Sequence, residues 1–232
     1  MNYACRAISL FCHKYGEGSV IAKIFTEDLG LKSYNLKRSS NKKSKNKLSL
    51  LESQSLIHIS GKNKNRQQIQ YLDEITLAYA FQNNTFKKKL IRTFVSEVLS
   101  KTLVDSEKNK DLFEFIWNMN ISVDEMEKID NKFCLEFLLK LSDFLGIYPS
   151  IENINYDFFN INNGVFTQNE IKGDYNLSGL NLEYFKKIIK KEKITIPSKN
   201  RKELIENMFN YFTCHHYNLS NIKSYNVIRA LE

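Results

Sequence analysis

The chain has 232 residues, of which 42% are hydrophobic and 26% are charged, and its formal net charge is +8. This length allows one or two domains with apolar cores of their own. No apolar stretch approaches the ~20 residues that a membrane-spanning helix needs, and the first residues do not read as a signal peptide. We therefore expect a cytoplasmic protein without a membrane partner.

The positive charge is concentrated in the first third of the chain. Residues 1–80 hold 13 Lys and Arg against 6 Asp and Glu, a net charge of +7. The remaining residues, 81–232, hold 21 basic and 20 acidic residues, a net charge of +1. Such an uneven distribution favours a polyanionic partner for the first part of the chain over a general bias in composition.

Short segments with strand character fill the first 80 residues. Gly16 and Gly18 mark a turn after the first of them, and Asp28-Leu29-Gly30 marks the next. The five candidate strands are Arg6–Phe11, Ser19–Thr26, Leu31–Leu36, Leu56–Ile59 and Gln68–Leu72. Five short strands at this spacing suit a small closed barrel, and the OB-fold is the five-stranded example. Periodicity alone leaves an SH3-like barrel open as an alternative.

The apolar period changes to that of a helix from about Thr85. Phe86, Leu90, Phe94 and Val98 recur every four residues, which is typical of one face of a helix. Further helices are expected around 112–116, 133–145, 182–191, 198–212 and 224–231, with a short hairpin near Asn163-Gly164 and with Ser198 as a helix cap. The predicted fold class is α+β, with a five-stranded OB-fold barrel over residues 1–80 followed by an all-helical domain over residues 81–232 for partner docking.

Two basic segments occupy loops of the predicted barrel. The stretch from Lys37 to Lys47 holds six cations and no acid, and a second basic loop from Lys62 to Arg66 joins the last two strands. Loops of an OB-fold flank its nucleic-acid groove, and cations there bind phosphates with release of counterions. A solvated loop without a partner is the alternative for either segment. The candidate nucleic-acid-binding residues are Arg6, Lys14, Tyr15, Lys37, Arg38, Lys42, Lys43, Lys45, Lys47, Lys62, Lys64 and Arg66.

Four aromatic residues of the barrel segment are candidates for stacking on nucleic-acid bases. Stacking on a positive groove is how sequence-tolerant binders of single strands work. Tyr15 follows the first strand directly and is the best candidate. We expect Phe25 and Tyr71 to lie in the core, and Tyr34 stays open between the two roles.

The sequence contains no recognisable catalytic or metal-binding motif. It lacks a phosphate-binding GxxxxGK[ST] loop, an HExxH motif, a GxSxG motif and the HxE with CxxC pattern of zinc deaminases. The four cysteines show no CxxC pair, and the adjacent residues Cys214, His215 and His216 diverge around a helix. Asp124, Glu125 and Glu127 are assigned to a helix start. We therefore expect no metal, no cofactor and no enzymatic activity.

Several short motifs resemble one bacterial family. The N-terminal motifs are residues 15–21, Tyr-Gly-Glu-Gly-Ser-Val-Ile, and residues 25–30, Phe-Thr-Glu-Asp-Leu-Gly. The later motifs are residues 113–117, 137–141, 145–149, 158–159, 163–166 and 222–231. In this order along nearly the whole chain they resemble the RecO family of recombination mediators, and most closely its Bacteroidetes-type branch.

This resemblance implies an OB-fold followed by a helical domain, and a role in DNA repair. It implies binding of single- and double-stranded DNA, annealing of complementary strands, and partnership with RecR and with the acidic C-terminal tail of single-strand binding protein. These partners together help to load RecA. Some members of the family carry a four-cysteine zinc module that this sequence lacks. An RNA-binding OB-fold protein, a metal-dependent nuclease and a purely structural adaptor remain as alternatives.

Overall fold

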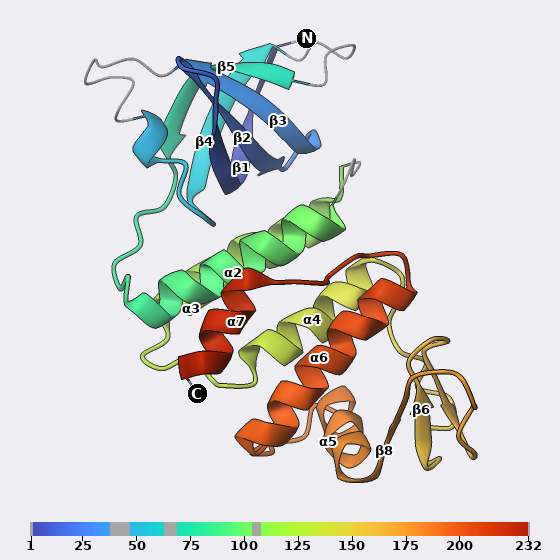
Figure 1. The fold of residues 1–232 in the computed structure, drawn as a ribbon. Helices are drawn as coiled ribbons and strands as arrows, with labels where there is room; N and C mark the ends of the chain where they lie inside the picture. Colours follow the sequence, from blue (N-terminus) through green and yellow to red (C-terminus); the bar gives the residue numbers. More distant parts are fainter. Residues whose placement is uncertain (1, 38–46, 63–68, 104–107, 232) are drawn as a thin grey trace. The chain divides into compact units, whose positions relative to one another are not determined.

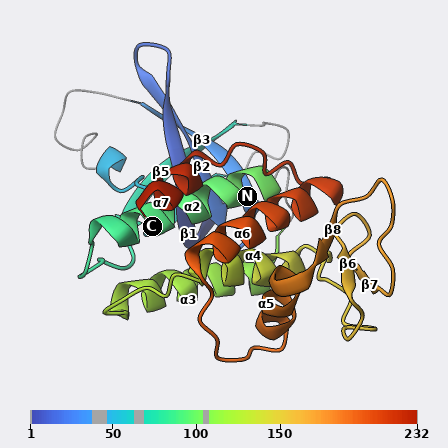
Figure 2. The ribbon, with the colours of Figure 1, turned by 60° about the horizontal axis from the view of Figure 1, so that its bottom comes forward.

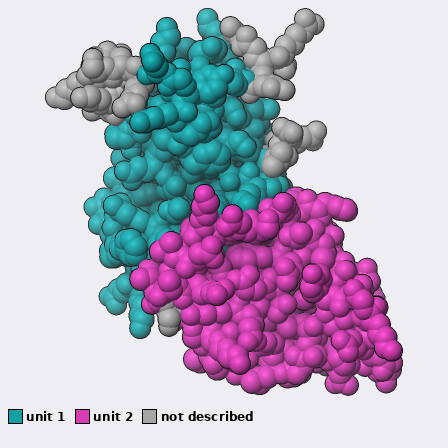
Figure 3. All heavy atoms as spheres, viewed as in Figure 1, with its two compact units in different colours: residues 1–128 teal, residues 129–232 magenta. Residues whose placement is uncertain are grey.

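The computed structural model describes residues 2–37, 47–62, 69–103 and 108–231. The chain divides into two compact units, residues 1–128 and 129–232, which Figure 3 colours teal and magenta. None of the described helices is long and apolar enough to cross a membrane.

A closed five-stranded barrel forms the first part of the chain, as the sequence predicts (Figure 1). Its strands are β1 (Asn2–Tyr15), β2 (Ser19–Thr26), β3 (Gly30–Lys37), β4 (Leu56–Lys62) and β5 (Ile69–Leu77), in the order β1-β2-β3-β5-β4. All neighbours are antiparallel except β3 and β5, whose parallel pairing closes the barrel. This is the α+β arrangement with an OB-fold barrel at its start.

Strand β1 is longer than its apolar run suggests, because it pairs with two different strands. Its first half pairs with β4 from Asn2 to Ile8, and its second half pairs with β2 from Ala7 to Tyr15. The register shifts between Ser9 and Phe11, and such a bulge bends a strand and increases its twist. The second half of β1 and the start of β2 form a hairpin that projects from the barrel (Figure 2).

The barrel interior is filled by alternate residues of each strand. Ala7, Ala22, Ile24, Tyr34 and Ile57 are fully buried there. Since successive side chains of a strand point to opposite faces, the neighbours of these residues point outward. This alternation fixes which side chains the barrel presents on its outside.

Two helices, α2 (Phe86–Thr102) and α3 (Lys110–Glu125), belong to the same compact unit as the barrel. Thr85 and Asn109 cap them by accepting hydrogen bonds from backbone N–H groups. The rings of Phe25 in β2 and Phe113 in α3 lie 5.6 Å apart. Strands give way to helices near residue 80, but the compact unit continues to the end of α3.

A buried amide relay also ties the barrel to both helices. Gln54, which precedes β4, donates a 3.0 Å hydrogen bond to the Ser96 hydroxyl of α2. Its side-chain oxygen accepts a 2.7 Å hydrogen bond from Asn120 of α3. Buried polar groups require such partners, so this relay fixes where the helices meet the barrel.

The second unit is helical apart from a small sheet. Its helices are α4 (Phe133–Phe144), α5 (Gly179–Ile189), α6 (Ser198–Cys214) and α7 (Lys223–Leu231), and its strands are β6 (Phe158–Asn160), β7 (Val165–Thr167) and β8 (Asn176–Ser178). The hairpin expected near Gly164 joins β6 to β7, and β8 adds a third strand. Ser198 is not the cap that was expected, because it is the first residue of α6 and Pro197 occupies the cap position.

The core of the second unit gathers around one aromatic residue. The ring of Phe159 lies 5.0 Å from the rings of Phe166 and Phe185 and 6.0 Å from that of Tyr211. Gly164 has φ +69°, and a Cβ there would lie 2.7 Å from the Tyr211 hydroxyl. The turn therefore requires glycine for its backbone angle and for this close approach.

Candidate nucleic-acid interface

Three rows of side chains on the outward parity of the strands run across the barrel, and one of their members, Ile21, is buried. We call this surface the outer face, and its members follow from the pairing register and from the buried residues between them. The first row is Tyr15, Ser19 and Lys37; the second is His13, Ile21, Asn35 and Tyr71; the third is Phe11, Lys23, Ser33 and Ile69. Directly paired residues project from the same side of a sheet, so each row is a line of neighbours.

Aromatic rings lie at both margins of the outer face. Tyr15 on β1 is 55% exposed and Tyr71 on β5 is 52% exposed. Along β1 the rings of Phe11 and His13 have centroids 6.1 Å apart. The Lys23 ammonium lies 5.7 Å from the centre of the Phe11 ring. Exposed rings beside cations are the combination that binds single strands by stacking and charge.

Of the predicted site residues that the structure describes, only Tyr15 and Lys37 belong to this face. Lys14 and Tyr15 end β1, and Lys37 ends β3 in the same row as Tyr15. Lys62 lies at the other end of β1, opposite Asn2. Lys47 is half-buried and donates a 3.0 Å hydrogen bond to the backbone carbonyl of Asp73. Arg38, Lys42, Lys43, Lys45, Lys64 and Arg66 lie outside the described residues.

Arg6 holds a different position from the other predicted site residues. Its guanidinium forms an ion pair with Glu27 at 3.0 Å and another with Glu114 of α3. It also lies over the rings of Phe113 and Trp117, at 5.4 and 5.1 Å from their centres. Hydrogen bonds from Arg6 lower the pKa of Glu27 below its ordinary value. Two carboxylates therefore already compensate the charge of Arg6. Through these contacts Arg6 joins α3 to the barrel.

The structure corrects one aromatic assignment and confirms another. Tyr71, expected in the core, is exposed on the outer face, whereas Phe25 is buried as expected. Tyr34 is completely buried and has no surface for stacking. Sequence reasoning did not single out Phe11, His13 or Lys23. Their alternation along the strands was a visible signal, but the bulge in β1 hides which parity points outward.

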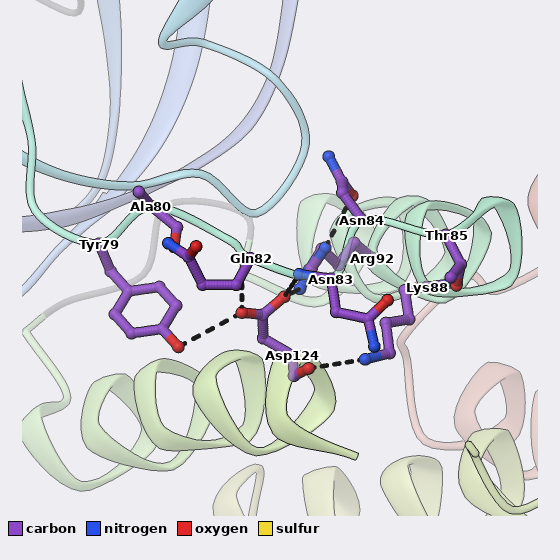
Figure 4. Close-up of polar contacts among 9 residues, drawn as sticks. All are labelled: Tyr79, Ala80, Gln82, Asn83, Asn84, Thr85, Lys88, Arg92 and Asp124. Atoms are coloured by element: carbon purple, nitrogen blue, oxygen red, sulfur yellow. Dashed lines mark hydrogen bonds and ion pairs between the residues drawn. The ribbon is translucent and has the colours of Figure 1, made fainter. Parts of the chain in front are cut away.

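A buried carboxylate holds the connection between β5 and α2 (Figure 4). Asp124 accepts hydrogen bonds from the backbone N–H groups of Gln82 at 2.8 Å and Asn83 at 3.2 Å. It also pairs with Arg92 at 3.3 Å, while Lys88 donates to its backbone carbonyl at 2.6 Å. Asp124 lies in the last turn of α3, so the assignment to a helix start was wrong. We call this cluster the Asp124 hub.

The four cysteines differ in burial. Cys5 and Cys134 are buried, Cys12 is exposed and Cys214 is half-buried, each as a free thiol. Within the described ranges no three ligand-type side chains come together in a way that holds a metal ion.

A closed five-stranded barrel of this topology places the protein in the OB-fold class. Comparison with known proteins agrees. Residues 1–81 match the family model described as "Recombination protein O N terminal".

The most similar relatives include proteins named DNA repair protein RecO. The one from Flavobacterium psychrophilum is 30% identical over 239 residues, covering 100% of this chain and 99% of the relative. Its counterpart from Flavobacterium johnsoniae is 32% identical over 171 residues, covering 72% and 71% of the two chains. That from Azobacteroides pseudotrichonymphae is 26% identical over 242 residues. The chain belongs to the RecO family of DNA repair proteins.

Proposed function

We propose that this protein is a non-enzymatic mediator of recombination that binds single-stranded DNA and anneals complementary strands. In this role it helps to load RecA on DNA coated with single-strand binding protein, with RecR and the acidic tail of single-strand binding protein as partners. The observation that carries the proposal is the outer face, with Tyr15 and Tyr71 half-exposed beside Lys23 and Lys37, in a chain of the RecO family.

The spacing of the aromatic residues along β1 supports a role in annealing. Alternate residues of a strand lie roughly 6.7 Å apart, whereas stacked bases of duplex DNA rise by about 3.4 Å each. A DNA strand that places successive bases against Phe11, His13 and Tyr15 therefore has an extended backbone and unstacked bases. Its pairing edges stay available to a complementary strand, and the finished duplex no longer fits this row of three rings.

The cations contribute by reducing the repulsion between two DNA strands. Each phosphate that a lysine neutralises releases condensed counterions, which favours binding and makes it depend on salt. With its backbone charge lowered, the bound strand repels an approaching complement less. Base pairing then selects the partner, and no chemical step is needed.

A salt titration with annealing followed in the same samples tests this proposal. Fluorescently labelled single-stranded DNA is titrated at several salt concentrations, and hybridisation of complementary strands is timed with and without the protein. We expect saturable binding that weakens steeply with salt, together with faster annealing. Equal competition by RNA of the same length would favour an RNA-binding role, and cleavage of the labelled strand with Mg²⁺ or Mn²⁺ would contradict the mediator role.

A further inference from the structure

A pocket of about 450 Å³ lies in the first unit between the barrel and α2. Its walls include Phe11 of β1, Phe81 of the β5–α2 connection, and Lys89, Arg92 and Thr93 of α2. This volume falls within the ~300–1,000 Å³ of pockets that hold small ligands. We call it the α2 pocket.

The α2 pocket is continuous with the outer face, because Phe11 belongs to both. Phe11 ends the aromatic stripe that begins at Tyr15 and continues through His13. A DNA strand that follows this stripe toward the bulge of β1 therefore arrives at the mouth of the pocket.

Apart from the acidic Glu52, the walls of the α2 pocket have the chemistry that an unstacked nucleobase requires. Phe11 and Phe81 are half-buried rings that offer apolar surface, and the exposed Lys89 offers a cation for the adjoining phosphate. Hydroxyl and amide groups that match the polar edge of a base come from Ser49, Ser53, Ser55, Asn84 and Thr93.

Arg92 is a buried cation in the wall of the α2 pocket. The residue is only 3% exposed, and its Nε donor has no acceptor among the residues that the structure describes. Buried donors normally have a partner, since leaving one unpaired is unfavourable. The Nε atom is itself enclosed, so Arg92 contributes a buried positive charge to the pocket wall and no donor that a ligand could reach.

The Asp124 hub makes these walls rigid before any ligand arrives. Asp124 holds Arg92 by an ion pair, and the guanidinium of Arg92 lies over the Phe81 ring at 3.5 Å from its centre. The backbone N–H groups of Gln82 and Asn83, which follow Phe81 directly, are bound to the same carboxylate. A wall held in this way loses little freedom on binding, which favours affinity.

We propose that the α2 pocket receives one unstacked base of the DNA strand that lies on the outer face. This inference rests on the proposed function, because it needs a strand on the outer face. The pocket then marks one end of the bound segment, and it holds that base away from the pairing partner.

Cys12 provides a probe for this proposal, since it lines the α2 pocket and is exposed. The full chain carrying Cys214→Ser is treated with N-ethylmaleimide, and modification of Cys12 is followed by peptide mass spectrometry. The measurement is made without DNA, with an oligothymidylate of about 12 nucleotides, which lies within known OB-fold site sizes, and with an abasic strand of equal length and charge. We expect the oligothymidylate to slow the modification several-fold and the abasic strand to leave it unchanged.

The variant Thr93→Trp fills the pocket and completes the test. It should lower affinity for the oligothymidylate several-fold and leave affinity for the abasic strand unchanged. Phe86→Trp, at an exposed position of α2, leaves the net charge unchanged like Thr93→Trp; it is the control and should behave like the parent chain. Binding without protection of Cys12, or equal protection by the abasic strand, would overturn the pocket assignment and leave the proposed function intact. A failure to bind either strand at low salt would instead overturn the proposed function.

Discussion

Tyr15 and Tyr71 expose about half of their surface at the two margins of the outer face, on β1 and β5. Both strands are held by pairing on the barrel, so the rings are presented without any rearrangement of the backbone. The residues between them, on β2 and β3, supply Lys23 and Lys37. Substitution of single residues on this face therefore tests the proposed DNA binding.

We expect Tyr15→Ala and Tyr71→Ala each to weaken binding of single-stranded DNA by about 1–3 kcal/mol, because each removes one stacking platform. Fluorescence anisotropy with a labelled oligonucleotide measures the effect. Tyr175→Ala is the control, since Tyr175 is 60% exposed but lies in the second unit. Unchanged affinity in both barrel variants would exclude stacking on these rings.

The second prediction for single residues concerns the contribution of Asp124 to stability. Burial acts to raise the pKa of Asp124, but the N–H groups of Gln82 and Asn83 and the guanidinium of Arg92 outweigh it, so the pKa is lowered. A carboxylate with a lowered pKa stabilises the fold above its unfolded-state pKa, and this contribution is lost as pH falls through the folded-state value. We therefore expect Asp124→Asn to lower the free energy of unfolding by about 3 kcal/mol at neutral pH.

Urea unfolding of parent and variant at a series of pH values checks this expectation. The difference between them should shrink below about pH 4, near the ordinary pKa of an aspartate. Asp143→Asn is the control, because Asp143 forms an exposed ion pair with Lys140 that contributes at most about 1 kcal/mol. A difference independent of pH would show that charge at Asp124 is not what stabilises the hub.

At the scale of elements, the connection between β3 and β4 carries the densest positive charge, at residues 37–47. We expect the triple variant Lys42→Glu, Lys43→Glu and Lys45→Glu to weaken DNA binding. It should also flatten the dependence of log affinity on log salt by about 2 units, since each phosphate contact to a single strand contributes about 0.7. Titrations across a salt series measure both effects.

A control with the same change of charge separates contact from long-range repulsion. Lys172, Lys187 and Lys193 are exposed in the second unit, and their reversal to Glu alters net charge equally. If both triple variants lose the same affinity and the same salt dependence, the assignment of the β3–β4 connection is wrong.

For Arg6 of β1 we expect the opposite result, a loss of stability without a change in DNA binding. Because Glu27 and Glu114 already compensate its charge, Arg6→Ala should lower stability by about 1–3 kcal/mol while the salt dependence of DNA binding stays unchanged. Thermal unfolding and the salt titration test the two halves of this statement. A reduced salt dependence at unchanged stability would restore Arg6 to the DNA-binding set.

At the scale of the whole molecule, the proposed function needs neither metal nor cofactor. We expect annealing of complementary strands to proceed at the same rate after treatment with EDTA, because charge neutralisation and base pairing carry the reaction. Hybridisation followed by fluorescence, with labelled strands examined for cleavage in parallel, gives the measurement. Loss of annealing on removal of metal would contradict this mechanism.

The fold class was predicted from apolar residues that repeat at short intervals along the chain. Val20, Ala22 and Ile24 alternate as a strand requires, and Phe86, Leu90 and Phe94 repeat as a helix requires, so both regions were recognised in advance. The collinear motifs likewise led to the RecO family, which the relatives confirm. Periodicity and motif order can be read directly along the chain. They are therefore recognisable without knowing how the chain folds.

The composition of the outer face depends on contacts between residues far apart in the chain. The pairing of Asn35 with Tyr71 turns Tyr71 outward, and the shift between Ser9 and Phe11 brings Phe11 into line with Lys23. Asp124 reaches residues 82 and 83 only because α3 returns to the β5–α2 connection. Register, bulges and packing are non-local, and a single sequence carries no direct record of them. The charge and the barrel were therefore readable from the chain, whereas the outer face and the α2 pocket became visible only in the folded molecule.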